Sequence, residues 1–222
     1  MALGAAWASG VNVYAVVLFL GGLGSLGFVA LPGELEILTH PVVLITAGVV
    51  YFVEFFADKI PGVDSLWDAV HTFIRIPAGA LLAGGAVAEI GEPYQVAAAL
   101  AMGGVVAAGS YATKAGARAV INTSPEPFSN WVASFTEDIL VIGGLSLAVY
   151  NPVLFFGFFL LFAILVAWLL PKLWRVLKRL MTRLRGGPVV ASPASSQPAS
   201  SQPSSLSGPK GILLSLDPRK RD

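Results

Sequence analysis

Cysteine is missing from the 222-residue sequence, and charged residues are scarce. Without cysteine there are no disulfide bonds and no thiolate metal sites, and the redox environment of the chain leaves no trace in the sequence. Only 12% of the residues are charged, whereas soluble domains have roughly 25%. Hydrophobic residues make up 55%, and the mean hydropathy is +0.75. This composition predicts a membrane protein.

Long apolar runs fill most of the chain before residue 172. A helix needs roughly 20 apolar residues to cross a bilayer core about 30 Å thick, and six segments reach or approach that length. We therefore predict an all-α fold, a polytopic transmembrane bundle of about six helices, in a domain that covers residues 1–171. The predicted helices span residues 11–31, 41–57, 66–88, 96–113, 131–150 and 152–170.

Lys and Arg are unevenly distributed along the chain. Of the fourteen, ten lie from Lys172 onward. Because cytoplasmic loops of membrane proteins are rich in Lys and Arg, we predict that both termini and the turns near Lys59 and Arg118 are cytoplasmic. The loops on the other side then carry only acidic charges, from Glu34, Glu36, Glu89 and Glu92.

The C-terminal part of the sequence differs from the rest in composition. Residues 172–185, from Lys172 to Arg185, alternate basic and apolar side chains. This pattern predicts a basic amphipathic helix against the anionic inner leaflet of the bilayer, and a plain stop-transfer and orientation signal explains it as well. Residues 186–222 contain the repeating stretch PASSQPASSQPSS. A Ser/Pro-rich segment cannot bury a core, so we predict a disordered tail.

Two parts of the chain resemble each other when the sequence is shifted by 64 residues. Pro61, Ser65 and Trp67 align with Pro, Ser and Trp at positions 125, 129 and 131, and two further identities follow within twelve positions. The shift spans two predicted helices, so the repeats, about residues 41–90 and 105–154, would have the same orientation in the membrane. We predict two helical hairpins related by a pseudo-two-fold axis along the membrane normal.

Ionisable residues occur inside the apolar segments at helical spacing. Asp64, Asp68, His71 and Arg75 follow one another at intervals of four, three and four residues, which places them on one face of a helix. A charged residue at the centre of a membrane helix costs roughly 2.5–3.5 kcal/mol on insertion scales, so these groups must face the bundle interior. The predicted polar cluster comprises Glu54, Asp58, Asp64, Asp68, His71, Arg75, Lys114, Arg118, Asn122, Ser134, Glu137 and Asp138.

The alignment of the repeats also predicts which charges meet. Glu54 aligns with Arg118, and Arg75 aligns with the residue after Asp138. If equivalent positions face the axis, Glu54 lies near Arg118 or Lys114, and Arg75 near Asp138 or its neighbour at 137.

Three long stretches resemble the motifs of a known family. They are EFFADKIPGVDSLWDAVHTFIRIPAGAL, KAGARAVINTSPEPFSNWVASFTED and the early SGVNVY. Over about residues 5–150 the chain resembles an uncharacterised bacterial membrane family, domain of unknown function 4126. The resemblance implies a polytopic protein of the bacterial inner membrane and brings no activity with it.

Three kinds of function are compatible with the polar cluster. A small transporter or channel is favoured, with a preference for cations or protons, because acids outnumber bases by 7 − 4 = 3 and His71 is a candidate proton relay. A membrane scaffold or assembly protein needs the same charges only as structural ion pairs. The acids are Glu54, Asp58, Asp64, Asp68, Glu126, Glu137 and Asp138, and the bases are Lys59, Arg75, Lys114 and Arg118.

The third alternative is a Mg²⁺-dependent enzyme that acts on a phosphorylated lipid head group. Asp64 and Asp68, one helical turn apart, are its candidate metal ligands, since hard cations bind carboxylate oxygens. The sequence contains no phosphate-loop, nucleophile-elbow or HExxH motif. No cofactor is evident, nucleic acid is not an expected partner, and a homo-oligomer is expected if one copy cannot enclose a pathway.

Overall fold

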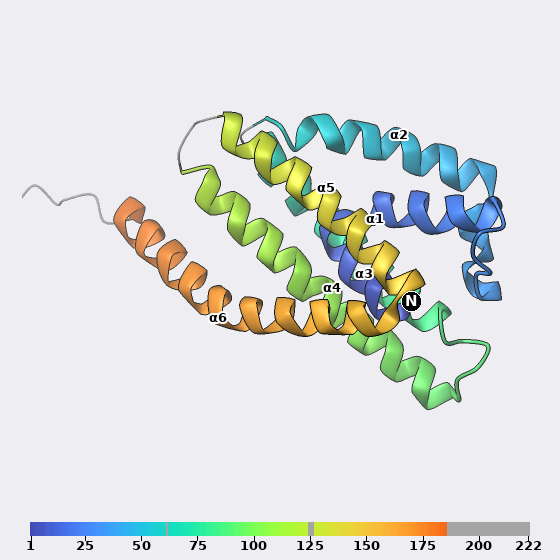
Figure 1. Ribbon diagram of the computed structural model, residues 1–222. Coiled ribbons are helices and arrows are strands. Elements are labelled where there is room, and N and C mark those ends of the chain that lie inside the picture. The colour runs from blue at the N-terminus through green and yellow to red at the C-terminus, as the bar shows by residue number, and fades with distance from the viewer. Residues whose placement is uncertain (61, 124–126, 186–222) are drawn as a thin grey trace, which may run out of the picture. The chain divides into compact units, whose positions relative to one another are not determined.

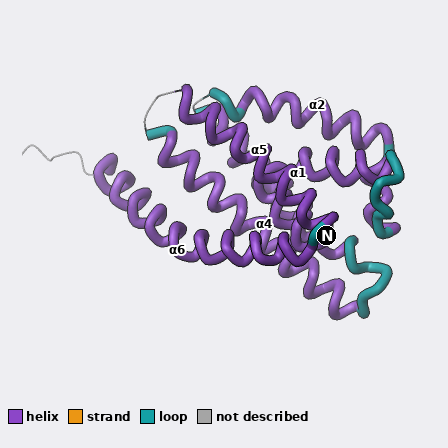
Figure 2. The backbone as a smooth tube through the Cα atoms, viewed as in Figure 1, coloured by secondary structure: helices purple, strands orange, loops and turns teal. Residues whose placement is uncertain are grey.

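A computed structural model of the chain describes residues 1–60, 62–123 and 127–185, and all regular structure in these ranges is helical (Figures 1 and 2). The predicted all-α helical bundle is therefore confirmed. The elements are α1 (Ala2–Ser25), the 3₁₀-helix η1 (Gly33–Thr39), α2 (Pro41–Ala57), α3 (Val63–Gly85), α4 (Pro93–Ile121), α5 (Pro127–Tyr150) and α6 (Pro152–Arg185).

Proline and local capping set where several helices begin. Pro41 and Pro93 open α2 and α4, where the missing N–H of proline has no helical partner to lose. The Val42 N–H donates to His40 Nδ1 at the start of α2. At the start of α4, the side chains of Glu92 and Gln95 cap each other's backbone reciprocally. The bounds of α2 are the predicted ones.

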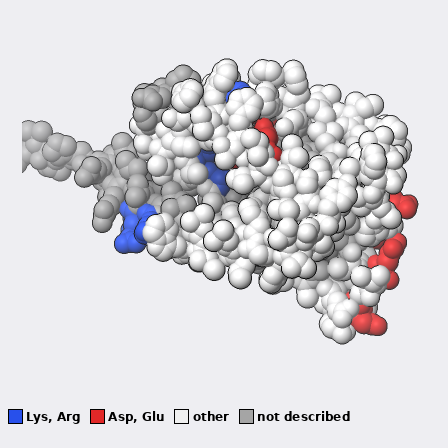
Figure 3. Space-filling model, viewed as in Figure 1, with Lys and Arg blue, Asp and Glu red and all other residues white. Residues whose placement is uncertain are grey.

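The bundle is apolar outside and charged inside. Large hydrophobic side chains such as Phe73, which is 84% exposed, cover its outer faces, whereas Glu54 and Arg75 at its centre are 0% exposed. Figure 3 shows one face that is almost free of charge between an acidic end, where η1 and the start of α4 lie, and a basic end on α6. Apolar side chains can remain at the surface in this way because lipid replaces water around them.

Three of the described helices are long and apolar enough to cross a membrane: α1, α4 and the Phe128–Tyr150 part of α5. The pair η1 and α2, bent by 63°, gives a fourth candidate if it counts as one span. Helices α3 and α6 are not among these candidates. Helix α3 carries several charged residues, and the apolar part of α6, Pro152–Trp168, is short. A membrane-embedded protein is supported, and the count of six spans stays a prediction.

The turns after α2 and after α4 meet at one end of the bundle, which we call the polar end. The Asn122 Nδ2 group, at the end of α4, donates to both carboxylate oxygens of Asp64 at 2.9 Å and to Ser65 Oγ at 3.0 Å. The Asn130 Nδ2 group of α5 donates to Asn122 Oδ1 at 3.0 Å. Both turns therefore lie on the same side, as the repeat requires, although the duplication itself stays a prediction.

Helix α1 is broken at its centre. The backbone of Asn12 is extended, with φ −152° and ψ 98°, and its Oδ1 accepts a hydrogen bond from the Ala15 N–H at 2.9 Å. The Asn12 side chain thus caps the second half of α1 as an N-cap residue does. Figure 1 shows the two halves of α1 meeting at an angle inside the bundle.

Both ends of α1 lie at the end of the bundle opposite the polar end. Gly4, in the first half, packs so closely on Ala148 that a side chain there would collide with it, and Ala148 lies near the α5–α6 turn. Gly21, in the second half, packs in the same way on the backbone of Leu38, just before α2. Helix α1 therefore enters the bundle, breaks at Asn12 and returns to the end from which it came.

This course corrects the predicted bounds of the first helix. That helix was expected at residues 11–31 as one span, but it begins at Ala2, breaks at Asn12 and ends at Ser25. The N-terminus was expected on the cytoplasmic side, with the two basic turns; the contact of Gly4 with Ala148 lies at the other end of the bundle, and the side of the membrane on which the N-terminus lies stays a prediction. The first Lys or Arg of the chain is Lys59, so the distribution of basic residues carried no information about the placement of α1.

Helix α6 runs from Pro152 through Pro171 to Arg185. The Lys172 ammonium lies 3.0 Å from the centre of the Trp168 ring, a cation–π contact. The predicted Ser/Pro-rich tail, residues 186–222, lies outside the described residues.

The course of α1 can be tested by cysteine labelling, because the natural chain has no cysteine. We expect Ala2→Cys and Ser25→Cys to react with a membrane-impermeant maleimide from the same side of the membrane. Thr123→Cys, at the exposed polar end, should react only from the other side. If Ala2→Cys and Ser25→Cys are labelled from opposite sides, α1 is a membrane span and our description of it is wrong.

Candidate functional site

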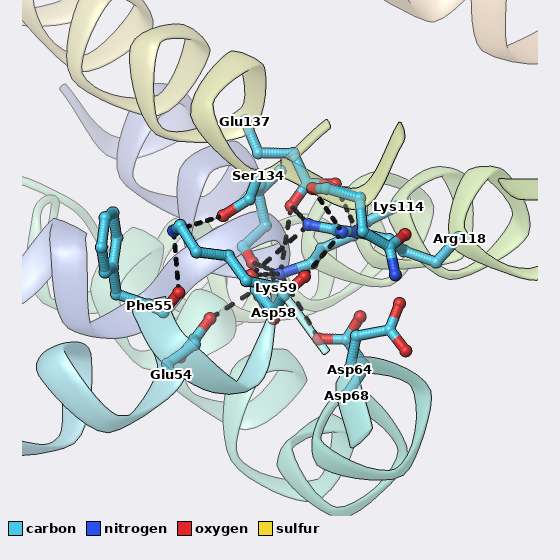
Figure 4. A network of polar contacts seen from close by, with 12 residues as sticks. Glu54, Phe55, Asp58, Lys59, Asp64, Asp68, Lys114, Arg118, Ser134 and Glu137 are labelled. Atoms are coloured by element: carbon cyan, nitrogen blue, oxygen red, sulfur yellow. Dashed lines mark hydrogen bonds and ion pairs between the residues drawn. The ribbon is translucent and has the colours of Figure 1, made fainter. Parts of the chain in front are cut away.

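The ammonium group of Lys114 lies at the centre of the buried charges (Figure 4). Four carboxylates surround its Nζ atom, and they come from α2, the turn after it, α3 and α5. The Lys114 side chain is 2% exposed. The distances from Nζ are 3.1 Å to Asp58 Oδ2, 3.3 Å to Glu137 Oε2, 3.4 Å to Asp68 Oδ1 and 3.7 Å to Glu54 Oε1.

Arg75 is the second base of this cluster. Its Nη2 group donates to Glu54 Oε1 and its Nη1 group to Asp68 Oδ1, both at 2.6 Å. Asp68 and Arg75 lie on the same face of α3 because they are seven residues, two helical turns, apart. Glu54 belongs to α2, so the guanidinium joins the two helices of the first hairpin.

Arg118 is the third base and joins α4 to α5. Its Nε and Nη2 groups donate to the two carboxylate oxygens of Glu137 at 3.1 and 2.9 Å. Such a two-point contact is the strong, directional form of an Arg–carboxylate pair. The Nη1 group donates to the backbone carbonyls of Asp58 and Asn130 at 3.0 and 3.2 Å. Arg118 therefore also holds the turn after α2.

The predicted pairing of charges is right in one part and wrong in another. Glu54 lies near Lys114, as predicted. Arg75 pairs with Glu54 and Asp68 rather than with Glu137 or Asp138. The alignment of the repeats assumed that acids and bases meet only between hairpins, whereas the two-turn spacing inside α3 lets Arg75 reach Asp68 on its own helix.

Other residues of the predicted cluster lie beside this network rather than in it. Asp64 accepts hydrogen bonds from the backbone N–H groups of Gly62 and Ser65 and from Asn122, so it holds the polar-end turns together. Asp138 interacts electrostatically with Tyr51 and Lys59.

His71 faces α1 instead of the ion pairs. Its ring stacks on Trp67 at 4.2 Å and meets the Tyr14 ring edge-on at 5.8 Å. Its Nδ1 atom is 2.8 Å from the Trp67 carbonyl oxygen. A role as a proton relay stays a prediction.

Lys59 is a buried lysine in a different environment. Its Nζ group donates to the Phe55 carbonyl at 2.9 Å and to Ser134 Oγ at 3.4 Å, and it lies 3.0 Å from the centre of the Phe55 ring. None of the ion pairs found among the described residues includes it. Burial lowers the pKa of the Lys59 ammonium, although nearby Asp138 and Asp58 oppose that change.

The broken helix α1 supplies backbone oxygens that the sequence did not predict. The Val11 carbonyl, next to the break, accepts from Lys114 Nζ at 3.3 Å. One turn earlier, the Trp7 carbonyl accepts from Ser110 Oγ at 2.8 Å. Gly10 lets the two helices approach, because a side chain there would collide with Ala107 and Ser110. The only signal in the sequence was the polar stretch SGVN inside an apolar segment.

Several buried oxygens of the cluster have no hydrogen-bond partner. These are Glu54 Oε2, Asp58 Oδ1 and Asp68 Oδ2, and each belongs to a carboxylate whose other oxygen contacts Lys114. A buried oxygen without a donor costs free energy. The four acids and three bases of the network also leave an excess of 4 − 3 = 1 negative charge.

A groove of about 560 Å³ leads from the surface to this network. It runs between α4 and α5 over Trp7 and Val11 of α1, and Lys114 and Glu137 line it. Figure 3 shows basic and acidic atoms at a hollow over these helices. Glu137, with 17% of its side chain exposed, is more accessible than the other carboxylates paired with Lys114.

The candidate metal ligands bind other groups. Asp64 contacts Asn122, and Asp68 contacts Arg75 and Lys114. In the described part of the chain, no group of three or more His, Asp or Glu side chains is arranged to hold a metal ion.

These features define a helical membrane protein with a charged network at its centre. The chain belongs to the family described as domain of unknown function DUF4126, which matches residues 1–172. The resemblance seen in the sequence is thereby confirmed and extends to the middle of α6. No curated protein and no solved structure matches the chain.

Removal of Arg75 should destabilise the fold strongly. In Arg75→Met, Glu54 and Asp68 stay buried with one base fewer, which typically costs about 3–5 kcal/mol. The matched control is Arg175→Met on α6, whose guanidinium is exposed and donates to the Pro171 carbonyl. We expect the control to change the free energy of unfolding by less than about 0.5 kcal/mol. Equal unfolding curves for the two variants in detergent would contradict this account.

Proposed function

We propose that this protein moves cations or protons across the membrane through the network around Lys114. The observation that carries the proposal is the break in α1, which places a backbone carbonyl among buried carboxylates. In membrane proteins, irregular backbone occurs where it is buried in protein or lines a cavity, and broken helices with free carbonyls form ion sites in transporters.

The sign of the charges supports a cation over an anion. The network has an excess of one negative charge, and three buried carboxylate oxygens have no donor. Two bases sit near the groove, but Lys114 and Arg118 are both already paired with Glu137 and with Asp58. An anion that entered the groove would therefore have to displace a carboxylate.

A structural scaffold is the second candidate, because the same contacts also tie the helices together. Arg118 alone links α4, α5 and the turn after α2. A scaffold, however, has no need for a broken helix whose carbonyl meets the charges. For the proposed transporter we retain the bacterial inner membrane as its location, the polar end as the cytoplasmic side and the basic part of α6 as the contact with anionic lipid.

Ion flux into liposomes tests the proposal. The purified chain is reconstituted, and Na⁺, K⁺ and proton gradients are applied one at a time while ion-sensitive dyes report uptake. We expect wild type to carry at least one of these ions. Glu137→Gln should reduce the flux at least about tenfold, because it removes the accessible acid of the network, and a tenfold loss needs only about 1.4 kcal/mol.

Glu36→Gln is the matched control, since Glu36 is an exposed acid of η1 far from the network. It should retain wild-type flux. Both variants are first checked by thermal unfolding, so that a loss of flux is not a loss of fold. Folded, inserted wild-type protein that carries none of the three ions would refute the proposal and favour the scaffold.

A further inference from the structure

We infer that the Lys114 ammonium is a tethered cation occupying a site for a free monovalent cation, and that transport exchanges the two. The inference rests on the proposed function and names its mechanism. The site is the set of oxygens within 3.7 Å of Lys114 Nζ, and we call it the cage. It consists of Glu54 Oε1, Asp58 Oδ2, Asp68 Oδ1, Glu137 Oε2 and the Val11 carbonyl oxygen.

The cage has the chemistry of a hard-cation site. Carboxylate and backbone carbonyl oxygens are the ligands that such cations prefer, and here they converge from five separate parts of the chain. One of them is a carbonyl that the break in α1 directs toward the charges. The four carboxylates are shared with Arg75 and Arg118, which leaves one acid more than the three bases neutralise, and the Val11 carbonyl is an oxygen ligand beyond those that neutralisation requires.

The unpaired carboxylate oxygens are a second, independent argument for a free cation at this site. Glu54, Asp58 and Asp68 are at least nine-tenths buried, and in each one oxygen faces Lys114 while the other lacks a partner. Arg75 and Arg118 already donate to Glu54 Oε1, Asp68 Oδ1 and Glu137 Oε2, while the Lys114 ammonium donates to Asp58 Oδ2 and the Val11 carbonyl. An ammonium has only three N–H donors, and the second oxygens of Glu54, Asp58 and Asp68 still have none. A free cation, which has no fixed number of donors, can bind both oxygens of a carboxylate.

The groove gives the lysine room to leave. Lys114 lines both the cage and the open 560 Å³ space between α4 and α5, where Thr113 and Thr136 offer hydroxyl groups. No group of three or more His, Asp or Glu side chains in the described part of the chain is arranged to hold a metal ion, so the carboxylates have to close on the free cation once the ammonium has left. When the ammonium moves into the groove, a monovalent cation restores the charge of the cage one for one.

Binding of sodium to a variant without the tethered cation tests this inference. Lys114→Met keeps the length of the side chain and removes its charge. We expect NaCl to raise the Tm of detergent-solubilised Lys114→Met by about 5 °C relative to choline chloride at equal concentration, as a saturating ligand does. Wild type should respond less, because its own ammonium competes with sodium.

Lys59→Met is the matched control. It removes a second buried lysine, but one that contacts Phe55 and Ser134 rather than the cage, so its response to sodium should equal that of wild type. Equal Tm values of Lys114→Met in sodium and choline would overturn the inference. A rise in MgCl₂ of equal ionic strength but not in NaCl would overturn the assignment to a monovalent ion.

A measurement on the wild-type chain covers the case in which Lys114→Met does not fold. An amine-reactive label, read out by mass spectrometry, should modify Lys114 at least about twofold faster in NaCl than in choline chloride, because sodium releases the ammonium into the groove. Labelling of Lys59 should not change. Equal labelling of Lys114 in both salts would overturn the inference.

The two proposals fail in different ways. If sodium stabilises Lys114→Met but wild type carries no ion, the cage exists and the proposed transport is wrong. If wild type carries an ion, but sodium changes neither the Tm of Lys114→Met nor the labelling of Lys114, the proposed transport stands and the inference of a tethered cation is wrong.

Discussion

The structure depends on the mutual neutralisation of charges that could not remain singly in a membrane. Arg75, Lys114 and Arg118 each meet at least two carboxylates, and these contacts join α2, α3, α4 and α5. Breaking one buried pair leaves the other charge uncompensated, which is why such pairs are costly to remove. The ion pairs therefore specify how the helices are arranged, while the outer apolar faces only require lipid.

The broken helix α1 is inserted between the other helices of the bundle. It contacts the other major helices through small residues, and its midpoint reaches the charges. A continuous helix at this position would have satisfied its carbonyls internally and left none for Lys114. The position of Asn12, which interrupts one half and caps the other, thus links the fold of the N-terminal segment to the chemistry of the cluster.

Much of the fold could be predicted from the sequence, because apolar length and proline positions are local signals. Helix α2 has the predicted bounds, and the network drew its acids and bases from the predicted set. The predicted partner of Arg75 was wrong because its contact with Asp68 within α3 competes with contacts between the hairpins. The return of α1 could not be predicted, because no proline marks the break and no Lys or Arg before Lys59 reports which side the N-terminus occupies.

The Arg118–Glu137 pair offers the most direct test of the central claim that charges from different helices hold the bundle together. The groove separates α4 from α5 where this two-point contact bridges them. In a double-mutant cycle of Arg118→Met and Glu137→Gln, with free energies of unfolding measured in detergent, we expect a coupling energy of about 1.5 kcal/mol or more. Single-variant effects that add to within about 0.5 kcal/mol would contradict the account.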